Sequence, residues 1–325
     1  MRARDTVLIV TNRYDEHASR VIKVFNERDI PVFRLNTEDL PREIMVEWRG
    51  EQWELRYHGR TLTPDCIRSC WYRRPSDAVV HDEIVDAGVQ TFVRDECHYV
   101  LQGLYRCLSD IVWVSHPDAL HAAQYKLHQL MLARELGFQT PETLVTNNPE
   151  TFRGFWSAHQ GRVIVKIAGR GPATIPLDTA IFTSVVGEDA LSHADTIRFA
   201  PHLFQQYVDK QYEARVTIIG DKVFAVRIDS QESEKTRIDW RHYDFEHTLH
   251  SAITLPSEVE ARCREMVRRY GLNFGAIDLI FTPDGEWVFL EINPNGQWLW
   301  LEELTKLPMT DALVELLAWK QGGAT

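Results

Sequence analysis

The sequence of 325 residues has no apolar run long enough to cross a membrane, no internal repeat and no low-complexity segment. The apolar core of its N-terminal segment, TVLIV, is too short for a secretory signal peptide. Its five cysteines form an odd set without a CxxC pair, which argues against a disulfide framework and against a zinc site. We therefore expect a soluble globular protein of the cytoplasm with reduced thiols.

Basic residues are also scarce relative to acidic ones. The chain has 36 Lys and Arg against 47 Asp and Glu, which gives a net charge of −11 and an isoelectric point near 5.6. Binding to nucleic acid or to an anionic membrane requires clustered Lys and Arg that displace counterions. We therefore expect neither of these surfaces as a partner.

Apolar periodicity predicts an α/β (α+β) protein that begins with a βαβ unit. The segment TVLIVTN is typical of a strand, 17–28 of an amphipathic helix, and PVFRLNT of a second strand. No GxGxxG follows the first strand, so a dinucleotide site of the Rossmann type is not expected there. A long helix fits 85–108, and we place a first domain at residues 1–114.

The next predicted helix carries a lysine. It begins at Ser115, where Pro117 and Asp118 are typical first-turn residues, and it ends at Gly137. Lys126 lies within it. Since a lysine on a helix is normally just solvated, its position alone gives weak support for a role.

A second lysine, Lys166, lies near the end of the apolar strand RVIVKIA, just before the loop GRGPATIP. Gly169 and Gly171 in this loop leave backbone N–H groups free to approach a phosphate closely. An ammonium group is costly to bury without an anion. Lys166 therefore either binds a phosphate or extends to water.

The segment AIDLIFTPDGEWVFLEINPNG is the most informative part of the sequence. If 284–285 form a two-residue turn, Asp278 lies directly opposite Glu291, with Asn293 on the same face. Two carboxylates about 5 Å apart repel each other, which favours a bound divalent cation. Two carboxylates and an amide suit Mg²⁺, which usually accompanies phosphates. A solvent-facing acidic hairpin is the alternative interpretation.

A second hairpin is predicted about Gly220 and Asp221, between YEARVTIIG and DKVFAVRID. Glu213 and Arg215 occupy the polar face of its first strand, which ordinary amphipathic patterning would also produce. In the charged loop that follows, Arg241 stands next to a tryptophan. An arginine beside transferring phosphates is a recurrent catalytic feature, whereas a solvated loop is the alternative.

Taken in order, a lysine on a helix, a lysine before a glycine loop, QQYV, an ExR hairpin and D…ExN resemble the ATP-grasp ligases over residues 115–325. WYRRP, DWR and the LEELTKLPM ending further resemble the graspetide (microviridin-type) macrocyclases of ribosomally made peptides. The resemblance implies an ATP-grasp fold with an N-terminal pre-ATP-grasp domain. It also implies a central subdomain at 115–200 with a glycine lid loop and a C-terminal subdomain at 201–325 with the metal hairpin.

The resemblance implies that one set of residues binds ATP. Its members are Lys126, Lys166, Gly169, Gly171, Gln206, Tyr207, Val208 and Glu213. The two lysines would contact the phosphates, 206–208 would form the adenine hinge mostly through backbone groups, and Glu213 would hold the ribose hydroxyls. Gln205 and Gln206 stand where many relatives have an acidic residue, which puts a side-chain contact to the adenine amino group in doubt.

The resemblance also implies the metal ligands and the catalytic residues. The implied Mg²⁺ ligands are Asp278, Glu291 and Asn293. The implied catalytic residues are Arg241, Lys166 and Arg215. Which of Arg215, Arg227 and Arg241 faces the phosphate depends on a strand register that the sequence leaves open.

The implied activity is ATP-dependent macrocyclisation of a precursor peptide. Asp or Glu side chains would be activated as acyl phosphates and joined to Ser or Thr as esters, or to Lys as amides. A leader segment of the peptide would lie along 225–241, where Arg237 and Asp239 are candidate contacts. A homodimer is expected only because dimers are the commonest assembly.

Three other functions remain open at this stage. The nearest is an ATP-grasp ligase that joins a free amino acid or a small carboxylic acid to a separate amine with the same site residues. The second is a phosphotransferase whose product stays phosphorylated, and the third is a nucleotide-binding regulatory module without turnover. The product would discriminate among them, because only cyclisation removes water from a single peptide.

Overall fold

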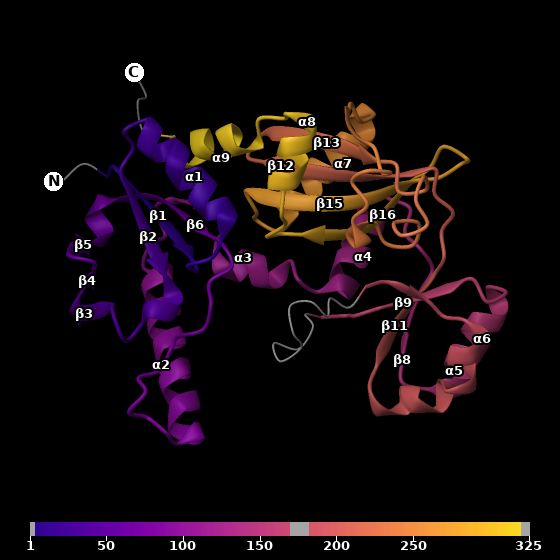
Figure 1. The fold of residues 1–325 in the computed structure, drawn as a ribbon, viewed down its shortest axis with the longest axis horizontal. Coiled ribbons are helices and arrows are strands. Elements are labelled where there is room, and N and C mark those ends of the chain that lie inside the picture. The colour runs from indigo at the N-terminus through magenta and orange to yellow at the C-terminus, as the bar shows by residue number, and fades with distance from the viewer. Residues whose placement is uncertain (1–3, 170–181, 320–325) are drawn as a thin grey trace.

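The computed structural model describes residues 4–169 and 182–319, which form three units (Figure 1). The N-terminal unit, drawn in indigo and purple, lies beside the orange and yellow C-terminal sheet, and the central unit lies at the far end of that sheet. Within the described ranges, no helix combines the length and apolar character that a membrane crossing requires. Short 3-10 helices occur at Thr37–Asp39 (η1), Pro64–Cys66 (η2), Ala194–Phe199 (η3) and Trp240–His242 (η4).

The N-terminal unit is a parallel sheet covered on both faces. Its elements are β1 (Thr6–Thr11), α1 (Glu16–Glu27), β2 (Val32–Asn36), β3 (Met45–Arg49), β4 (Gln52–Tyr57), β5 (Arg60–Leu62), β6 (Ile67–Tyr72), α2 (Ala87–Arg106) and β7 (Val112–Val114). The sheet has the order β2-β1-β6-β7, and β1 is buried along its whole length, as expected when both sides of a parallel sheet are covered. Val7 and Ile9 belong to the core with α1, whereas Leu8 and Val10 belong to the core with α2 and the small sheet β3-β4-β5.

The helix predicted over 115–137 is two helices in the structure, α3 (Pro117–Ala122) and α4 (Lys126–Glu135). The single-helix prediction is therefore wrong. The carbonyl of Ala123 accepts a hydrogen bond from the buried side chain of Gln129 at 2.6 Å, and the same amide also bonds the backbone of Ile292. Because the break precedes Lys126, this lysine lies in the first turn of α4 rather than within a continuous helix.

Among the residues that the structure describes, the central unit is an antiparallel sheet with two helices. Its elements are β8 (Thr143–Thr146), α5 (Pro149–Ala158), β9 (Val163–Lys166), β10 (Ser184–Val185), α6 (Glu188–Ser192) and β11 (His202–Gln206). The order is β10-β9-β11-β8. A small core of its own includes Phe152 from α5, Val163 from β9 and Phe204 from β11. Lys166 ends β9, as the sequence predicted.

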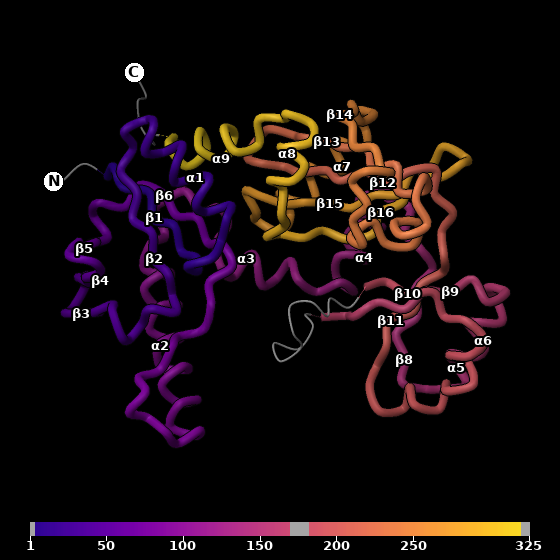
Figure 2. Tube along the Cα trace, in the orientation of Figure 1, coloured from indigo at the N-terminus to yellow at the C-terminus, as the bar shows by residue number. Residues whose placement is uncertain are grey.

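The C-terminal unit is a five-stranded antiparallel sheet in the order β14-β13-β12-β15-β16. Its elements are β12 (Tyr212–Ile219), β13 (Lys222–Ile228), β14 (His250–Ile253), α7 (Ser257–Arg269), β15 (Phe274–Phe281), β16 (Trp287–Asn293), α8 (Leu299–Thr305) and α9 (Met309–Ala318). One face packs on α4 and α7 in a single core. On the other face, α9 joins this sheet and the N-terminal sheet in one core, and Figure 2 shows the chain returning to the N-terminal unit along α9.

The β12–β13 hairpin turns at Gly220 and Asp221, as predicted, because Ile219 pairs directly with Lys222. The prediction of a two-residue turn between β15 and β16 is wrong. Thr282 bonds to Glu286 around a three-residue loop whose glycine, Gly285, has φ +86°, a common geometry for such loops.

That loop shifts the register of the β15–β16 pair by one residue relative to the prediction. A β-bulge compensates for the shift, since Asp278 pairs with Glu291 whereas the next residue, Leu279, pairs with Phe289 and leaves Leu290 as the extra residue. The predicted pairing of Asp278 with Glu291 is therefore confirmed, although the predicted turn is not.

His17 of α1 connects the N-terminal unit to the start of α8. Its Nε2 accepts hydrogen bonds from the backbone N–H groups of Trp298 at 3.0 Å and Leu299 at 3.3 Å. An acceptor nitrogen requires the neutral ring. Burial, followed by the charges of Arg73 and Arg74, lowers the pKa of His17 to about 2.

The low pKa of His17 predicts a pH-dependent stability. Below the ordinary His pKa of 6.5, the unfolded chain takes up a proton that the native state does not bind, so the free energy of unfolding falls as pH falls. Between about pH 7 and pH 5, wild type should lose about 2 kcal/mol more than His17→Gln, whose amide keeps an acceptor. Urea denaturation at both pH values measures this difference, and equal losses in the two proteins would contradict it.

Candidate active site

One cavity is lined by side chains of both the central and the C-terminal units. The predicted site residues that line it are Lys126, Lys166, Gly169, Gln206, Tyr207, Val208, Glu213, Arg241, Asp278, Glu291 and Asn293. Gly171 lies outside the described residues. Arg215 does not line the cavity, but its partner Asp278 does. The structure thus gathers residues from α4, β9, β11, β12, β15, β16 and η4 around one space.

Each of the two opposed carboxylates has a cationic partner. Asp278 accepts two hydrogen bonds from Arg215 Nη1, at 2.7 and 2.9 Å, and Glu291 contacts the ammonium group of Lys126. Burial raises the pKa of Asp278 and Glu291 adds to the rise, against the opposing effect of Arg215. Burial also opposes ionisation of Glu291, but Lys126 and Lys166 outweigh it and lower its pKa to about 2.

The donor set at this position fits a magnesium ion. Asp278, Glu291 and Asn293 supply only oxygen donors, and hard divalent cations select oxygen ligands. The amide oxygen of Asn293 has a fixed direction because it accepts the N–H of Asn295 at 3.0 Å. Two carboxylates directly opposite each other repel, and Lys126 and Arg215, which lie beside them, compensate part of this repulsion.

Arg241 is held in place by Asp239, which is 5% exposed. Asp239 accepts hydrogen bonds from Arg241 Nε at 2.8 Å and from the backbone N–H of Thr183 at 3.0 Å. Burial opposes ionisation of Asp239, but these bonds and the charge of Arg241 lower its pKa to about 2. The expectation that Asp239 contacts a leader peptide is therefore wrong, because its carboxylate is buried against Arg241. Arg237 is exposed, as such a contact requires.

The strand register excludes Arg227 from the cavity. Arg227 pairs with Ala214 on β12, so it lies on the face opposite to Arg215. It forms an ion pair with Asp229 at 2.6 Å and lies over the ring of Tyr212. Arg241, unlike Arg227, lines the cavity.

Lys166 completes a cationic group around Glu291. Burial lowers the pKa of Lys166, Glu291 opposes this effect, and Lys126 and Arg241 lower the pKa further. These mutual effects place Lys126, Lys166 and Arg241 within electrostatic range of one carboxylate. These three cations face two carboxylates, Glu291 and Asp239, so one positive charge is in excess. Excess positive charge is the environment that a polyphosphate needs.

Sequence reasoning missed Lys210, which is buried and lines the cavity. Its ammonium group contacts Glu213 Oε1 at 2.9 Å and donates to the carbonyl of Ile238 at 3.1 Å. Glu213 also interacts with Ser230, and its Oε2 makes no well-formed hydrogen bond among the described residues. The only available signal was the spacing of Lys210 three residues before Glu213.

The predicted adenine hinge, 206–208, begins at the last residue of β11. The N–H groups of Gln206 and Tyr207 already donate to the carbonyls of Glu142 and Arg162, both at 2.9 Å. The side chain of Gln205 is buried and donates to Thr143 at 3.0 Å. This side chain is therefore not placed to contact adenine.

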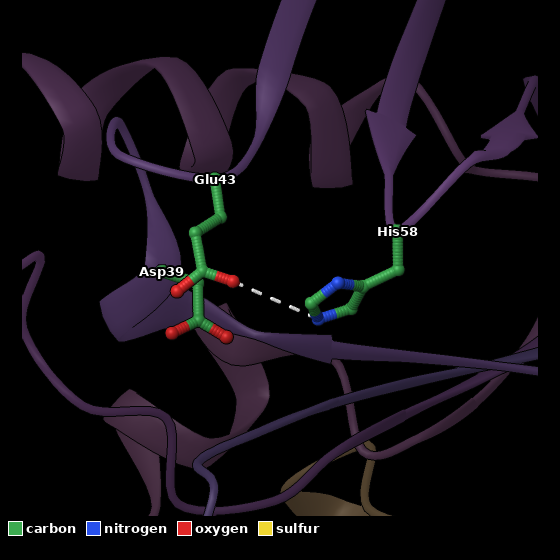
Figure 3. A group of neighbouring side chains, drawn as sticks. All are labelled: Asp39, Glu43 and His58. Carbon is green, nitrogen blue, oxygen red and sulfur yellow. Dashed lines mark ion pairs between the residues drawn. The ribbon is translucent and has the colours of Figure 1, made fainter.

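A second group of acidic and histidine side chains lies in the N-terminal unit, at Asp39, Glu43 and His58 (Figure 3). His58 Nε2 is 3.8 Å from Glu43, and both side chains are largely exposed. Arg13 already forms ion pairs with Asp39 and Glu43. Because Glu43 and His58 are exposed, and exposed acidic groups commonly lie close together without an ion, we assign no metal to this group.

Comparisons with known proteins give solved structures that are similar to this chain over almost its whole length. The macrocyclase MdnC from Microcystis aeruginosa MRC, solved with the precursor peptide MdnA, is 30% identical over 96% of this chain and 99% of its own, with a TM-score of 0.85. This chain belongs to the ATP-grasp macrocyclase family. The family model described as the MvdD pre-ATP grasp domain matches residues 6–121. The predicted ATP-grasp fold and the assignment as an ATP-dependent ligase are therefore confirmed.

Two further solved structures are similar over almost the whole chain. A RiPP-associated ATP-grasp ligase from Chryseobacterium gregarium, in complex with ADP and a leader and core peptide, is 29% identical over 96% of both chains, with a TM-score of 0.86. The macrocyclase MdnB from Microcystis aeruginosa MRC is 29% identical over 96% of this chain and 99% of its own, with a TM-score of 0.80. No match to a curated protein was found.

Proposed function

We propose that this ATP-grasp ligase is a macrocyclase of a ribosomally made precursor peptide. It activates Asp or Glu side chains of the peptide and joins them to Ser or Thr as esters, or to Lys as amides. The observation that carries the proposal is the convergence of Lys126, Lys166 and Arg241 on the Asp278–Glu291 pair in one cavity. Similarity to family members solved with ADP and with precursor peptides supports it.

Each part of the nucleotide has a candidate partner in the cavity. Glu213 Oε2 would accept from the ribose hydroxyls, since it lacks a well-formed hydrogen bond among the described residues. Adenine would use Val208 N–H and the hinge carbonyls, because the N–H groups of Gln206 and Tyr207 are already bonded. Lys126 would exchange Glu291 for a phosphate oxygen, and Lys166 would remain beside it.

For the metal, the proposal assigns Asp278, Glu291 and Asn293 as the residues that would hold Mg²⁺. When bound, the ion would neutralise charge on the polyphosphate. Lys126 and Arg215 compensate the same carboxylates from the protein side. Lys126 is then available to a phosphate once the ion holds Glu291.

The reaction would have two steps at one place. A carboxylate oxygen of the peptide attacks the γ-phosphorus of ATP, and ADP leaves, so that an acyl phosphate forms. Arg241 stabilises the charge on the transferring group and is oriented by Asp239. A hydroxyl or amine of the same peptide then attacks the carbonyl carbon, inorganic phosphate leaves, and proximity within one chain lowers the barrier.

The cellular setting is also part of the proposal. All five cysteines are free thiols, which supports a reduced compartment such as the cytoplasm. A homodimer stays a prediction from the general frequency of dimers. A leader segment would bind outside the cavity, where Arg237 is exposed.

The test is intact-mass analysis of a short peptide encoded beside the gene and rich in Ser, Thr or Lys and in Asp or Glu. With Mg-ATP, we expect the peptide to lose the mass of one water for each ring formed, while samples without ATP stay unchanged. A product that joins the peptide to an added amine would indicate a ligase of separate molecules. A stable gain of phosphate would indicate a phosphotransferase, and either result would contradict macrocyclisation.

A further inference from the structure

Arg73 of the N-terminal unit reaches into the loop that follows the metal-binding strand β16. Its side chain is 1% exposed. Nη1 donates to the carbonyl oxygens of Asn295 at 2.6 Å and Gly296 at 2.9 Å, and it lies 3.1 Å from Asn295 Oδ1. The loop begins directly after Asn293, the amide in the proposed magnesium set. A residue more than 200 positions away in sequence therefore holds the backbone beside a metal ligand.

The same loop contacts both Asn293, a member of the proposed metal set, and Arg215, the partner of Asp278. The N–H of Asn295 donates to Asn293 Oδ1 at 3.0 Å, and the N–H of Gly296 donates to the Asn293 carbonyl at 3.3 Å. A Cβ on Gly296 would lie 2.7 Å from Arg215 Nη2 and 2.6 Å from the Cβ of Ala276. The loop is thus packed directly on Arg215, the partner of Asp278, and only glycine allows this approach.

Burying the charged guanidinium group of Arg73 costs free energy, because the group has few partners. Its nearest carboxylate is Asp15, whose Oδ2 lies 3.4 Å from Nε. Nε and Nη2 make no well-formed hydrogen bond among the described residues. A buried guanidinium with incomplete partners is a poor source of stability. The shortest hydrogen bonds of Arg73 go to the loop beside Asn293. The effect of this buried side chain is therefore to hold that loop in position.

We propose that Arg73 is a positioning residue for the magnesium site, an inference that rests on the proposed function. It holds Asn295 and Gly296 in place. That loop in turn fixes the direction of Asn293 Oδ1 and the packing of Arg215 against Asp278. The N-terminal unit then contributes to metal binding without touching the metal.

The structure offers a matched control on β6, the strand that leads into Arg73. Arg68 of β6 also donates across the unit boundary, from Nη1 to the carbonyl of Ala318 at 3.2 Å. That carbonyl ends α9 rather than the metal loop. Arg68→Gln therefore removes an arginine-to-carbonyl contact of the same kind without touching Asn293 or Arg215.

The experiment measures ADP binding by calorimetry as a function of Mg²⁺ concentration. Arg73→Lys keeps the charge but loses the paired contacts, and we expect it to need about tenfold more Mg²⁺ for half-maximal enhancement, the usual effect of removing a residue that supports a metal ligand. ADP binding in the presence of a chelator should match wild type. Arg68→Gln should match wild type in both measurements.

A second variant keeps the test decisive if Arg73→Lys does not fold. Asn295→Ala removes the side-chain oxygen that Arg73 Nη1 contacts at 3.1 Å and keeps the backbone bonds of the loop. Because Arg73 then holds the loop less firmly, the Mg²⁺ requirement should rise in the same direction. A folded variant of either kind with wild-type Mg²⁺ dependence would overturn the inference. If wild type itself bound no nucleotide with Mg²⁺, the proposed function would fail instead, so the two failures are distinguishable.

Discussion

An Arg241→Gln variant is expected to form ADP about 10³-fold more slowly than wild type, because an arginine on the transferring phosphoryl group commonly contributes this much. Arg241 lines the cavity, and two bonds to Asp239 fix its guanidinium. Its contribution is largest when charge develops on the γ-phosphate, so ADP affinity should change little. A coupled assay with saturating Mg-ATP and the precursor peptide measures the rate, and calorimetry measures ADP affinity.

Arg227→Gln is the matched control for this prediction. Arg227 is another arginine of the same unit with a carboxylate partner, Asp229, but it lies on the far face of the sheet. Its replacement should leave the rate of ADP formation unchanged. Equal losses in the two variants would mean that the assay reports a general effect of arginine removal rather than a contact at the phosphate.

The β15–β16 hairpin shows both the power and the limit of sequence reasoning. Two carboxylates at the right separation predicted a cross-strand pair, and Asp278 does pair with Glu291. The assumed turn was one residue too short, and the bulge at Leu290 compensates for it. Local turn propensity could not reveal the bulge, since the extra residue is set by packing along the whole strand.

The prediction of one continuous helix around Lys126 was wrong for a related reason. Apolar spacing continues across 123–125, so a pattern based on one chain segment predicts one helix. The break depends on the side chain of Gln129, which bonds to Ala123 and to Ile292 of β16. A contact with a strand more than 160 residues later is not encoded in local spacing.

Residues that act through a partner were the hardest to predict. Asp239 and Lys210 both stand in charged segments, where solvation is the ordinary interpretation. Only the fold shows that Asp239 is buried against Arg241 and that Lys210 is buried against Glu213. The motifs identified the groups that would touch ATP, whereas the residues that orient them became visible only through tertiary packing.

Helix α2 gives the complementary case. Its existence and limits were predicted well from apolar spacing, since 85–108 was expected and Ala87–Arg106 is observed. Yet Val89 and Phe92 are exposed, and the buried residues lie in its second half. Figure 1 shows why, because the first half of α2 extends beyond the sheet that covers the second half. Periodicity predicts a helical face but not how much of it has a neighbour.

Disrupting the Arg215–Asp278 pair is expected to have the largest effect on stability. Arg215 and Asp278 are 6% and 11% exposed in their side chains. Removing one partner of a buried pair leaves an uncompensated charge, which costs about 3–5 kcal/mol. Arg215→Met and Asp278→Asn should each lower the free energy of unfolding by this amount, as measured by urea denaturation without nucleotide.

The double variant Arg215→Met, Asp278→Asn tests whether the loss comes from the pair itself. With both charges gone, no charge is left buried alone, so the double variant should lose about 1–3 kcal/mol less than the sum of the two single variants. Replacing Lys222 of the exposed Lys222–Glu315 pair should change stability little, because both side chains are more than half exposed. Additive losses at Arg215 and Asp278 would instead mean that Arg215 contributes through its contacts with Gly296 and Trp240 rather than through the carboxylate.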